Sequence, residues 1–173
     1  MSTDASDTFA DSLAALDVEL TRTPAAEATK AIADRTEMPA VGTPLTIDGV
    51  SLPGGVRTVE ASGHLDREPV DGAATGITQA AFAIADYGSI ALDLAPAGDE
   101  PVSLYADTHV AVLRESDVLP DMPAAFERLG ETIPDDRGST ILATGPSATA
   151  DMGELVRGAH GPQAVEVVVV TDR

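Results

Sequence analysis

Residues 144–151 (Thr-Gly-Pro-Ser-Ala-Thr-Ala-Asp) form the stretch whose residue types best suit ligand chemistry. They lie between a predicted strand and a predicted helix. Gly145 and Pro146 form a turn in which glycine allows close backbone approach, and Ser147 or Thr149 can cap the helix. The free N–H groups and the helix dipole would then suit a small anion such as a carboxylate or phosphate. The alternative is a plain helix cap. The stretch is not a P-loop, because it lacks the Gly-Lys-Ser/Thr ending.

A second candidate is the turn 157–162 (Arg-Gly-Ala-His-Gly-Pro). Gly158 would end the predicted helix, and Gly161-Pro162 would lead the chain into its last strand. His160 stands in this turn, where it can act as a general base or ligand beside the anion site. The alternative is that His160 caps the helix carbonyl groups.

Two further segments carry candidate side chains. Ser103 and His109 flank Asp107, and His109 opens a predicted strand, where polar side chains often face a crevice. Asp107 and His109 could share a metal ion, but no third ligand stands at a diagnostic spacing, so we predict no metal site. Asp86 is a candidate acid or base, and the alternative is a solvated carboxylate. His109 is a second candidate catalytic residue beside His160, and Ser89 and Ser103 are candidate ligand-binding residues.

Hydrophobic patterning predicts alternating strands and helices. In the second half of the chain, the predicted strands and helices alternate. The run Val167–Val170 is apolar on both faces, which is typical of a buried parallel strand. We therefore expect a single α/β domain with a mostly parallel central sheet flanked by helices, with ligands beyond the carboxyl ends of the strands. The predicted helices are 7–20, 24–35, 76–86, 122–129 and 149–156, and the predicted strands are 56–61, 89–94, 108–113, 139–143 and 165–170.

The charge balance points to a salt-adapted, folded protein. Aspartate and glutamate total 29 against ten lysines and arginines, giving a net charge of −19, while hydrophobic residues reach 43%. Such hydrophobicity argues against a disordered chain, and high salt would screen the repulsion. We predict a halophilic source. No basic run is present to neutralise phosphates, which excludes nucleic acid and anionic membranes as expected partners.

The 173-residue chain contains no cysteine. This excludes disulfides, thiolate nucleophiles and cysteine ligation of an iron–sulfur cluster, and no cofactor is expected. The acidic N-terminus does not resemble a signal peptide, and no apolar run reaches membrane-spanning length, so we expect a cytoplasmic protein without membrane insertion.

Taken together and in order, four segments resemble the LUD-domain family, of the lactate-utilisation protein C (LutC/YkgG) type. The chain has Ala148 where the family often has arginine, and Tyr87 where it often has threonine. The matching segments are 84–89 (Ile-Ala-Asp-Tyr-Gly-Ser), 103–109 (Ser-Leu to His), 145–151 (Gly-Pro-Ser-x-Thr-Ala-Asp) and 158–162 (Gly-x-His-Gly-Pro).

The resemblance implies a fold similar to that of NagB, RpiA and CoA transferases. The resemblance is good from about Asp71 to Asp172 and weak before that. We expect an N-terminal helical segment, 1–40, packed on a LUD-like α/β domain, 41–173. The resemblance also implies an accessory subunit, itself without a cluster, that serves the oxidation of L-lactate to pyruvate. Such a subunit would bind a small anion or a partner, the partners being iron–sulfur oxidoreductase subunits. The alternatives are a stand-alone enzyme on a CoA or sugar-phosphate substrate, and an interaction module without chemistry, so enzymatic activity stays open.

Overall fold

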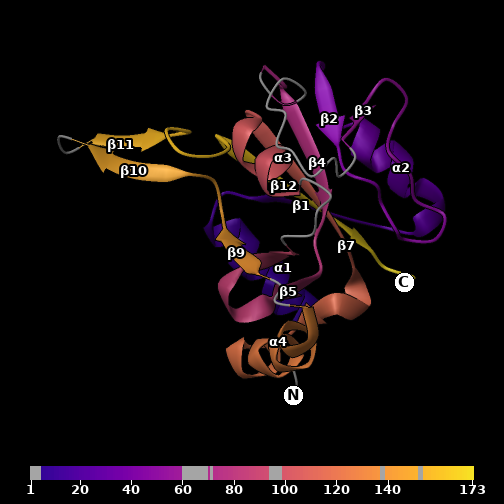
Figure 1. Cartoon of the computed structure of the whole chain (residues 1–173), viewed down its shortest axis with the longest axis vertical. Coiled ribbons are helices and arrows are strands. Elements are labelled where there is room, and N and C mark those ends of the chain that lie inside the picture. The colour runs from indigo at the N-terminus through magenta and orange to yellow at the C-terminus, as the bar shows by residue number, and fades with distance from the viewer. Residues whose placement is uncertain (1–4, 60–69, 71, 94–98, 137–138, 152–153) are drawn as a thin grey trace.

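The structure is a computed structural model of the chain, shown in Figure 1. It describes all residues except 1–4, 60–69, 71, 94–98, 137–138 and 152–153.

A six-stranded sheet forms the centre of the molecule. Its strand order is β1-β12-β7-β4-β2-β3, and every neighbouring pair is parallel. The fold prediction of an α/β domain with a mostly parallel central sheet is therefore confirmed. The strands are β1 Glu19–Thr23, β12 Ala164–Val170, β7 Thr108–Arg114, β4 Thr75–Gln79, β2 Ala40–Gly42 and β3 Arg57–Thr58.

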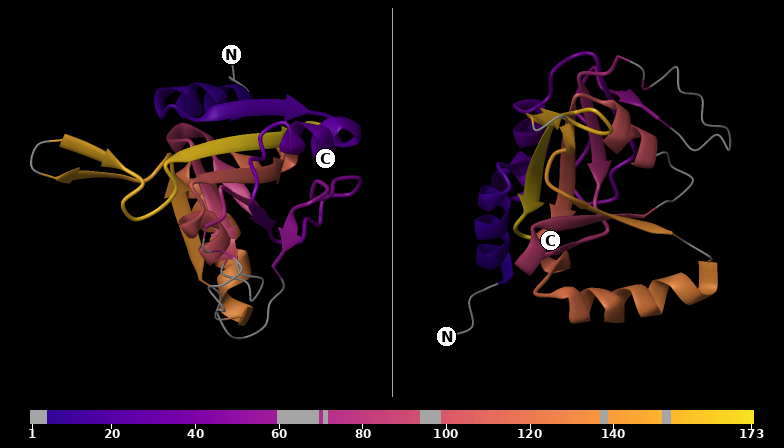
Figure 2. Two further views of the ribbon diagram at one scale, coloured as in Figure 1. Left: turned by 90° about the horizontal axis from the view of Figure 1, so that it is seen from above. Right: turned by 90° about the vertical axis from the view of Figure 1, so that its left-hand side faces the viewer.

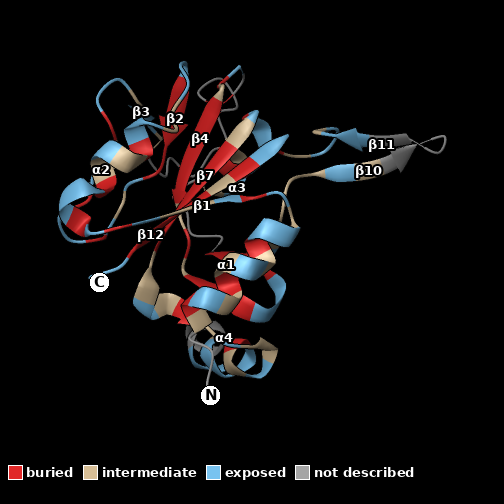
Figure 3. Cartoon of the chain, turned by 180° about the vertical axis from the view of Figure 1, so that it is seen from behind, coloured by how far each residue is buried: buried red, intermediate tan, exposed pale blue. Residues whose placement is uncertain are grey.

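The two faces of this sheet bury different sets of side chains, because side chains alternate along each strand. On β7, Val110 and Val112 pack in the cluster that contains α2 (Ala25–Ala33). The side chains of His109, Ala111 and Leu113 point to the other face of the sheet. Ala111 and Leu113 pack there in the cluster that contains α1 (Ala5–Ala15). The middle strands are mostly buried (Figure 3). Helices thus flank both faces of the sheet.

A second sheet lies on the α1 side of the molecule. Its order is β8-β5-β6-β9, and it is mixed, with β5 and β8 parallel and the other neighbours antiparallel. The helix α4 (Met122–Asp136) packs on its outer side through Ala125 and Leu129. The strands are β8 Val118–Leu119, β5 Phe82–Ile84, β6 Ser89–Asp93 and β9 Thr140–Thr144, with short 3-10 helices η1 Ala85–Tyr87 and η2 Glu115–Asp117 between elements.

The helix α3 (Asp99–Tyr105) sits unusually close to β4. A Cβ atom at Gly76 would overlap the Val102 carbonyl oxygen, so only glycine permits this approach. Val102 is fully buried as a result. The close approach fixes the height of α3 above the sheet and holds Ser103, the next residue, near the interior.

A two-stranded hairpin projects from the body of the molecule, as Figures 1 and 2 show. It consists of β10 (Ala148–Asp151) and β11 (Glu154–Arg157), paired antiparallel with Thr149 opposite Val156. The predicted helix at 149–156 is therefore wrong. Of the two candidate cap residues, Thr149 lies in β10 and Ser147 lies just before it, and the β-branched Thr149 and Val156 are opposite each other in the pairing.

The predicted helix at 76–86 is also wrong. The segment contains β4, β5 and the start of η1. Alanine favours helices in isolation, but Ala80 and Ala83 are here almost completely buried between layers, where tertiary packing overrides the local preference.

The other predicted elements agree with the structure in type. Strands β6, β7, β9 and β12 confirm the predictions at 89–94, 108–113, 139–143 and 165–170, and α2 and α4 confirm those at 24–35 and 122–129. The helix predicted at 7–20 ends at Ala15, because Asp17 takes a left-handed backbone (φ 57°) that turns the chain into β1. Of the strand predicted at 56–61, β3 covers 57–58, and residues 60–61 lie outside the described residues.

The N-terminal segment contributes a strand to the central sheet. β1, from the N-terminal segment 1–40, is hydrogen-bonded to β12 and so belongs to the central sheet. Among the described residues, no helix combines the length and the hydrophobicity needed to cross a membrane.

Candidate functional site

A cavity of about 400 Å³ lies between the central sheet and the second sheet. We call it the inner cavity. Its walls come from β7 and β12, from β6 and β9, and from α1 and α3. Six of the residues predicted from the sequence line it: Ser103, His109, Gly145, Pro146, Ser147 and His160.

His109 is the most deeply buried polar group in this wall. Its side chain is 2% exposed, and its Nε2 lies 2.8 Å from the Thr78 hydroxyl. Burial lowers the pKa of His109 to about 4, because the charged imidazolium would lose its hydration. At neutral pH, His109 is therefore an uncharged imidazole, which can donate one hydrogen bond and accept another.

Ser103 lies on the facing helix, α3. Its side chain is 3% exposed, and its hydroxyl donates to the Glu100 carbonyl oxygen over 2.8 Å. This local bond uses the hydroxyl proton and leaves the oxygen as an acceptor. Ser103 and His109 therefore supply two neutral polar groups to the inner cavity.

The segment 144–148 and the turn 158–162 form one continuous wall. The Ser147 N–H donates to the Pro162 carbonyl oxygen (2.9 Å), and the Gly158 N–H donates to the Ser147 carbonyl oxygen (3.0 Å). Gly145 takes a left-handed backbone (φ 66°), which glycine adopts without strain. His160 is exposed at this wall and marks the side on which the inner cavity meets solvent.

The expected mechanism of anion binding at this stretch is wrong. β10 follows Ser147, so no helix dipole points at the cavity from residues 148–151. The Ser147 N–H is also already paired with Pro162. The helix dipole and the row of free N–H groups that a helix start would offer are thus absent from this described segment.

Three predicted residues are not among the described residues that line the inner cavity. Asp86 is exposed on η1. The Ser89 hydroxyl lies 2.6 Å from the Thr144 hydroxyl and ties β6 to β9. Thr149 lies in the hairpin, opposite Val156. Ser89 therefore supports the wall indirectly, while Asp86 and Thr149 lie apart from the cavity.

The site also contains residues that the sequence did not single out. Thr78, the hydrogen-bond partner of His109, falls within the segment mistaken for a helix. The apolar walls come from strand residues whose alternation was the available signal: Ile90, Leu92, Ile141, Ala143, Val165 and Val167.

The location differs from the one expected for an open α/β sheet. His109 is the second residue of β7 and Val165 is the second residue of β12, so the inner cavity lies near the amino ends of these strands. The expected place was beyond the carboxyl ends. The difference arises because the second sheet and α1 cover this face and leave space between the two sheets.

The inner cavity has no formally charged lining in a chain that is very acidic. Among the described lining residues there is no aspartate, glutamate, lysine or arginine, and the two histidines are the titratable groups. Within the described part of the chain, no group of three or more histidine or carboxylate side chains is placed to hold a metal ion. The chemistry of the site therefore rests on neutral hydrogen bonds and apolar contact.

The parallel sheet, the covering second sheet and the flanking helices define a single α/β domain with a cavity between its two sheets. The LUD domain model matches residues 18–170, and the chain belongs to this family. This match covers most of the chain, including all strands that line the inner cavity.

The chain is also similar to curated relatives and to a solved structure. The chain is 37% identical over 109 residues to lactate utilization protein C of Deinococcus radiodurans, covering 61% of this chain and 50% of that protein. It is 32% identical to the protein of the same name from Bacillus subtilis, covering 57% of this chain and 42% of that protein. The chain thus spans about half the length of these curated relatives. The crystal structure of a DUF162 family protein from Deinococcus radiodurans superposes with a TM-score of 0.77 at 26% identity, covering 96% of both chains.

Proposed function

We propose that this chain serves lactate utilisation as an accessory subunit without a cluster of its own, and that it binds a small carboxylate at the inner cavity. The names of its relatives support the pathway. The chain has no cysteine for an iron–sulfur cluster, so electron transfer would fall to partner subunits that carry such clusters.

The observation that carries the proposal is the meeting of separate sequence segments at one cavity. Ser103 and His109 come from α3 and β7, while Ser147 and His160 come from the two ends of the hairpin. A pocket with apolar walls and a few convergent polar groups is the usual form of a small-molecule site.

The polar groups divide into an inner and an outer set. His109 and Ser103 are buried, whereas Ser147 is partly exposed and His160 is exposed. A carboxylate keeps most of its hydration only in the outer part, where the hydroxyl of Ser147 and the imidazole of His160 can donate hydrogen bonds to it. We place the carboxylate there, at the mouth of the inner cavity.

The alternative of an enzyme acting on a CoA or sugar-phosphate substrate fits this cavity less well. Phosphates are usually held by arginine, lysine or a helix N-terminus. None of the described lining residues is a lysine or arginine, and Ala148 stands where the family often has arginine. An interaction module without chemistry remains the other alternative, and the projecting hairpin, with Val156 exposed, is the feature that favours it.

Growth on L-lactate tests the proposed function. We expect deletion of the gene from its host to abolish growth on L-lactate but not on pyruvate, and the unaltered gene to restore it. Ala143→Phe should fail to restore growth, because Ala143 lines the inner cavity and the larger ring would project into it and obstruct the ligand. Leu142→Phe is the matched control, since Leu142 is the neighbouring residue, 39% exposed, on the other side of β9.

Normal growth of the deletion strain on L-lactate would refute the role in lactate utilisation. Equal restoration by both variants, with both proteins present at normal levels, would show instead that the role does not use the inner cavity.

A further inference from the structure

The inner cavity is larger than lactate or pyruvate requires. Its volume of about 400 Å³ falls in the range of roughly 300–1,000 Å³ that is typical of sites for much larger organic ligands. A single water occupies about 30 Å³ in the liquid, so a ligand as small as lactate would leave most of this volume to solvent. The size therefore calls for a ligand with a longer body.

The walls are apolar on several sides. Leu13 comes from α1, Ile90 and Leu92 come from β6, and Val165 and Val167 come from β12. These side chains pack in one hydrophobic cluster and are almost fully buried, so they form an apolar layer directly behind the cavity. Such walls favour an apolar ligand group and disfavour a charged one.

The buried end offers hydrogen bonds without charge. His109 is neutral at physiological pH, and Ser103 presents an acceptor oxygen. A carboxylate placed at this end would lose its hydration with no cation to compensate it, since no described lining residue is a lysine or arginine. The inner part of the ligand is therefore uncharged.

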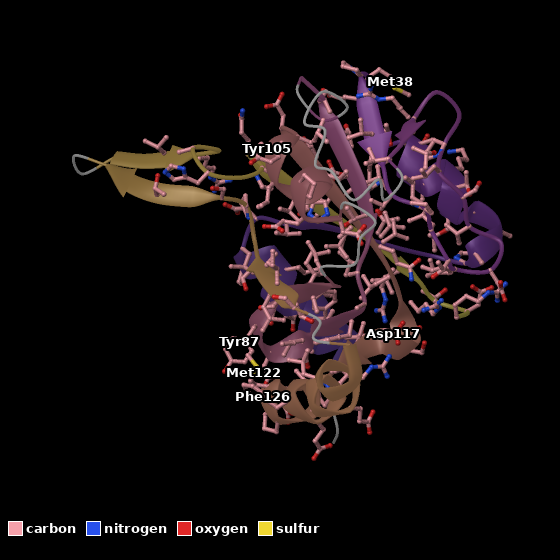
Figure 4. All side chains as sticks on the ribbon, viewed as in Figure 1. Met38, Tyr87, Tyr105, Asp117, Met122 and Phe126 are labelled. Carbon is pink, nitrogen blue, oxygen red and sulfur yellow. The ribbon has the colours of Figure 1, made fainter. Side chains whose placement is uncertain are left out.

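A second hollow, which we call the outer groove, borders the inner cavity beside His160. Its volume is about 380 Å³, and it shares Leu104, His160 and Gly161 with the inner cavity. Tyr105, 50% exposed on α3, lines the outer groove and is labelled in Figure 4. A ligand that extends outward from the inner cavity thus passes His160 and reaches solvent.

We infer that the natural ligand is an amphipathic monocarboxylate, with its carboxylate beside His160 and an uncharged aliphatic or aromatic body in the inner cavity. This inference rests on the proposed function, in which the inner cavity binds a carboxylate, and it adds the class of ligand. The ligand is thus a longer acid than lactate.

A homologous series of straight-chain acids tests the inference. We would titrate the full chain in concentrated KCl with acetate, butyrate, hexanoate and octanoate by calorimetry, together with L-lactate and hexanamide. Each added methylene should tighten binding about fourfold, the factor that corresponds to roughly 0.8 kcal/mol of transfer free energy. Hexanamide should bind more weakly than hexanoate, because it lacks the charge that the donors at the mouth recognise.

Two variants locate the binding. Ala143→Phe should remove the gain with chain length, and Leu142→Phe should retain it, because only Ala143 lines the inner cavity. Affinity that does not change with chain length would overturn the inference. If lactate and the short acids still bound, the proposed function would stand without it, whereas a failure of every acid to bind would overturn both. Hexanamide binding as tightly as hexanoate would overturn the assignment of a carboxylate.

Discussion

The melting temperature should rise by roughly 10–20 °C as KCl is increased from about 0.1 M to about 2 M. The reason is the repulsion among 29 carboxylates that face only ten basic residues. The Debye length falls from about 10 Å to below about 3 Å over this range, so most of the repulsion between exposed charges is screened. A rise of this size corresponds to about 5 kcal/mol for a domain of this length.

The structure shows how far pairing already relieves the repulsion. Among the described residues, at least seven basic side chains form ion pairs with carboxylates: Arg22, Lys30, Arg35, Arg114, Arg128, Arg157 and Arg173. Most of these pairs are at least partly exposed and contribute little individually. At one-to-one pairing, ten bases leave 19 carboxylates without a basic partner, which is the net charge of −19.

A variant with fewer charges provides the control. Asp11, Glu27 and Glu127 are exposed, so Asp11→Asn, Glu27→Gln and Glu127→Gln together should raise the melting temperature at low salt and flatten its dependence on KCl. A melting temperature that is constant in salt, or highest at low salt, would contradict the halophilic interpretation.

Acid should destabilise the fold through His109. The pKa of this buried histidine is lowered from 6.5 to about 4. Between these values the unfolded chain binds a proton that the folded chain does not, so lowering the pH favours unfolding. The stabilisation is complete above pH 6.5 and is lost as the pH falls toward 4, and the full change is about 3 kcal/mol.

Denaturant unfolding across this pH window, compared between variants, isolates the contribution. His109→Gln removes the titration but keeps a polar group near the Thr78 hydroxyl, so its stability should fall less steeply from pH 6.5 to 4. His160→Gln removes an exposed histidine and should leave the slope of the native chain unchanged. Equal slopes for the native chain and His109→Gln would mean that His109 is not buried in neutral form.

The sequence predicts an element correctly where its own residue pattern is enough to determine its secondary structure. The strand at Val167–Val170 is apolar on both faces, and it proves to be a buried central strand with parallel neighbours. The amphipathic helices at the N-terminus and at Met122 also follow from their periodicity.

The two wrong helices show where local patterns fail. In 76–86, alanines that favour a helix are instead required by close packing, and Gly76 is glycine because α3 passes directly over it. At the start of 149–156, Ser147 and Thr149 follow a turn and resemble helix caps, but pairing between two short strands decides the outcome. Both decisions depend on residues far away in the sequence.

The sequence identified part of the cavity lining, but it did not predict how the lining residues are arranged. His109 and His160 stand out by residue type, and both line the inner cavity. The neutral state of His109 depends on its burial beneath the second sheet, and the bond to Thr78 depends on the register of β4 and β7. The absence of charge among the described lining residues likewise emerges only when six elements are brought together.

The central claim is that the inner cavity binds a carboxylate, and amide NMR shifts of the ¹⁵N-labelled chain test it most directly. We would titrate L-lactate, pyruvate and hexanoate at constant ionic strength, with chloride as the reference anion. For each acid, the account predicts saturable shifts that fit one dissociation constant at all affected amides and centre on Leu104, Gly145, Ser147 and Gly161. Hexanoate should bind most tightly, and the shifts should disappear in Ala143→Phe. Shifts that spread over the acidic surface without saturating, or that leave these four amides unmoved, would contradict it.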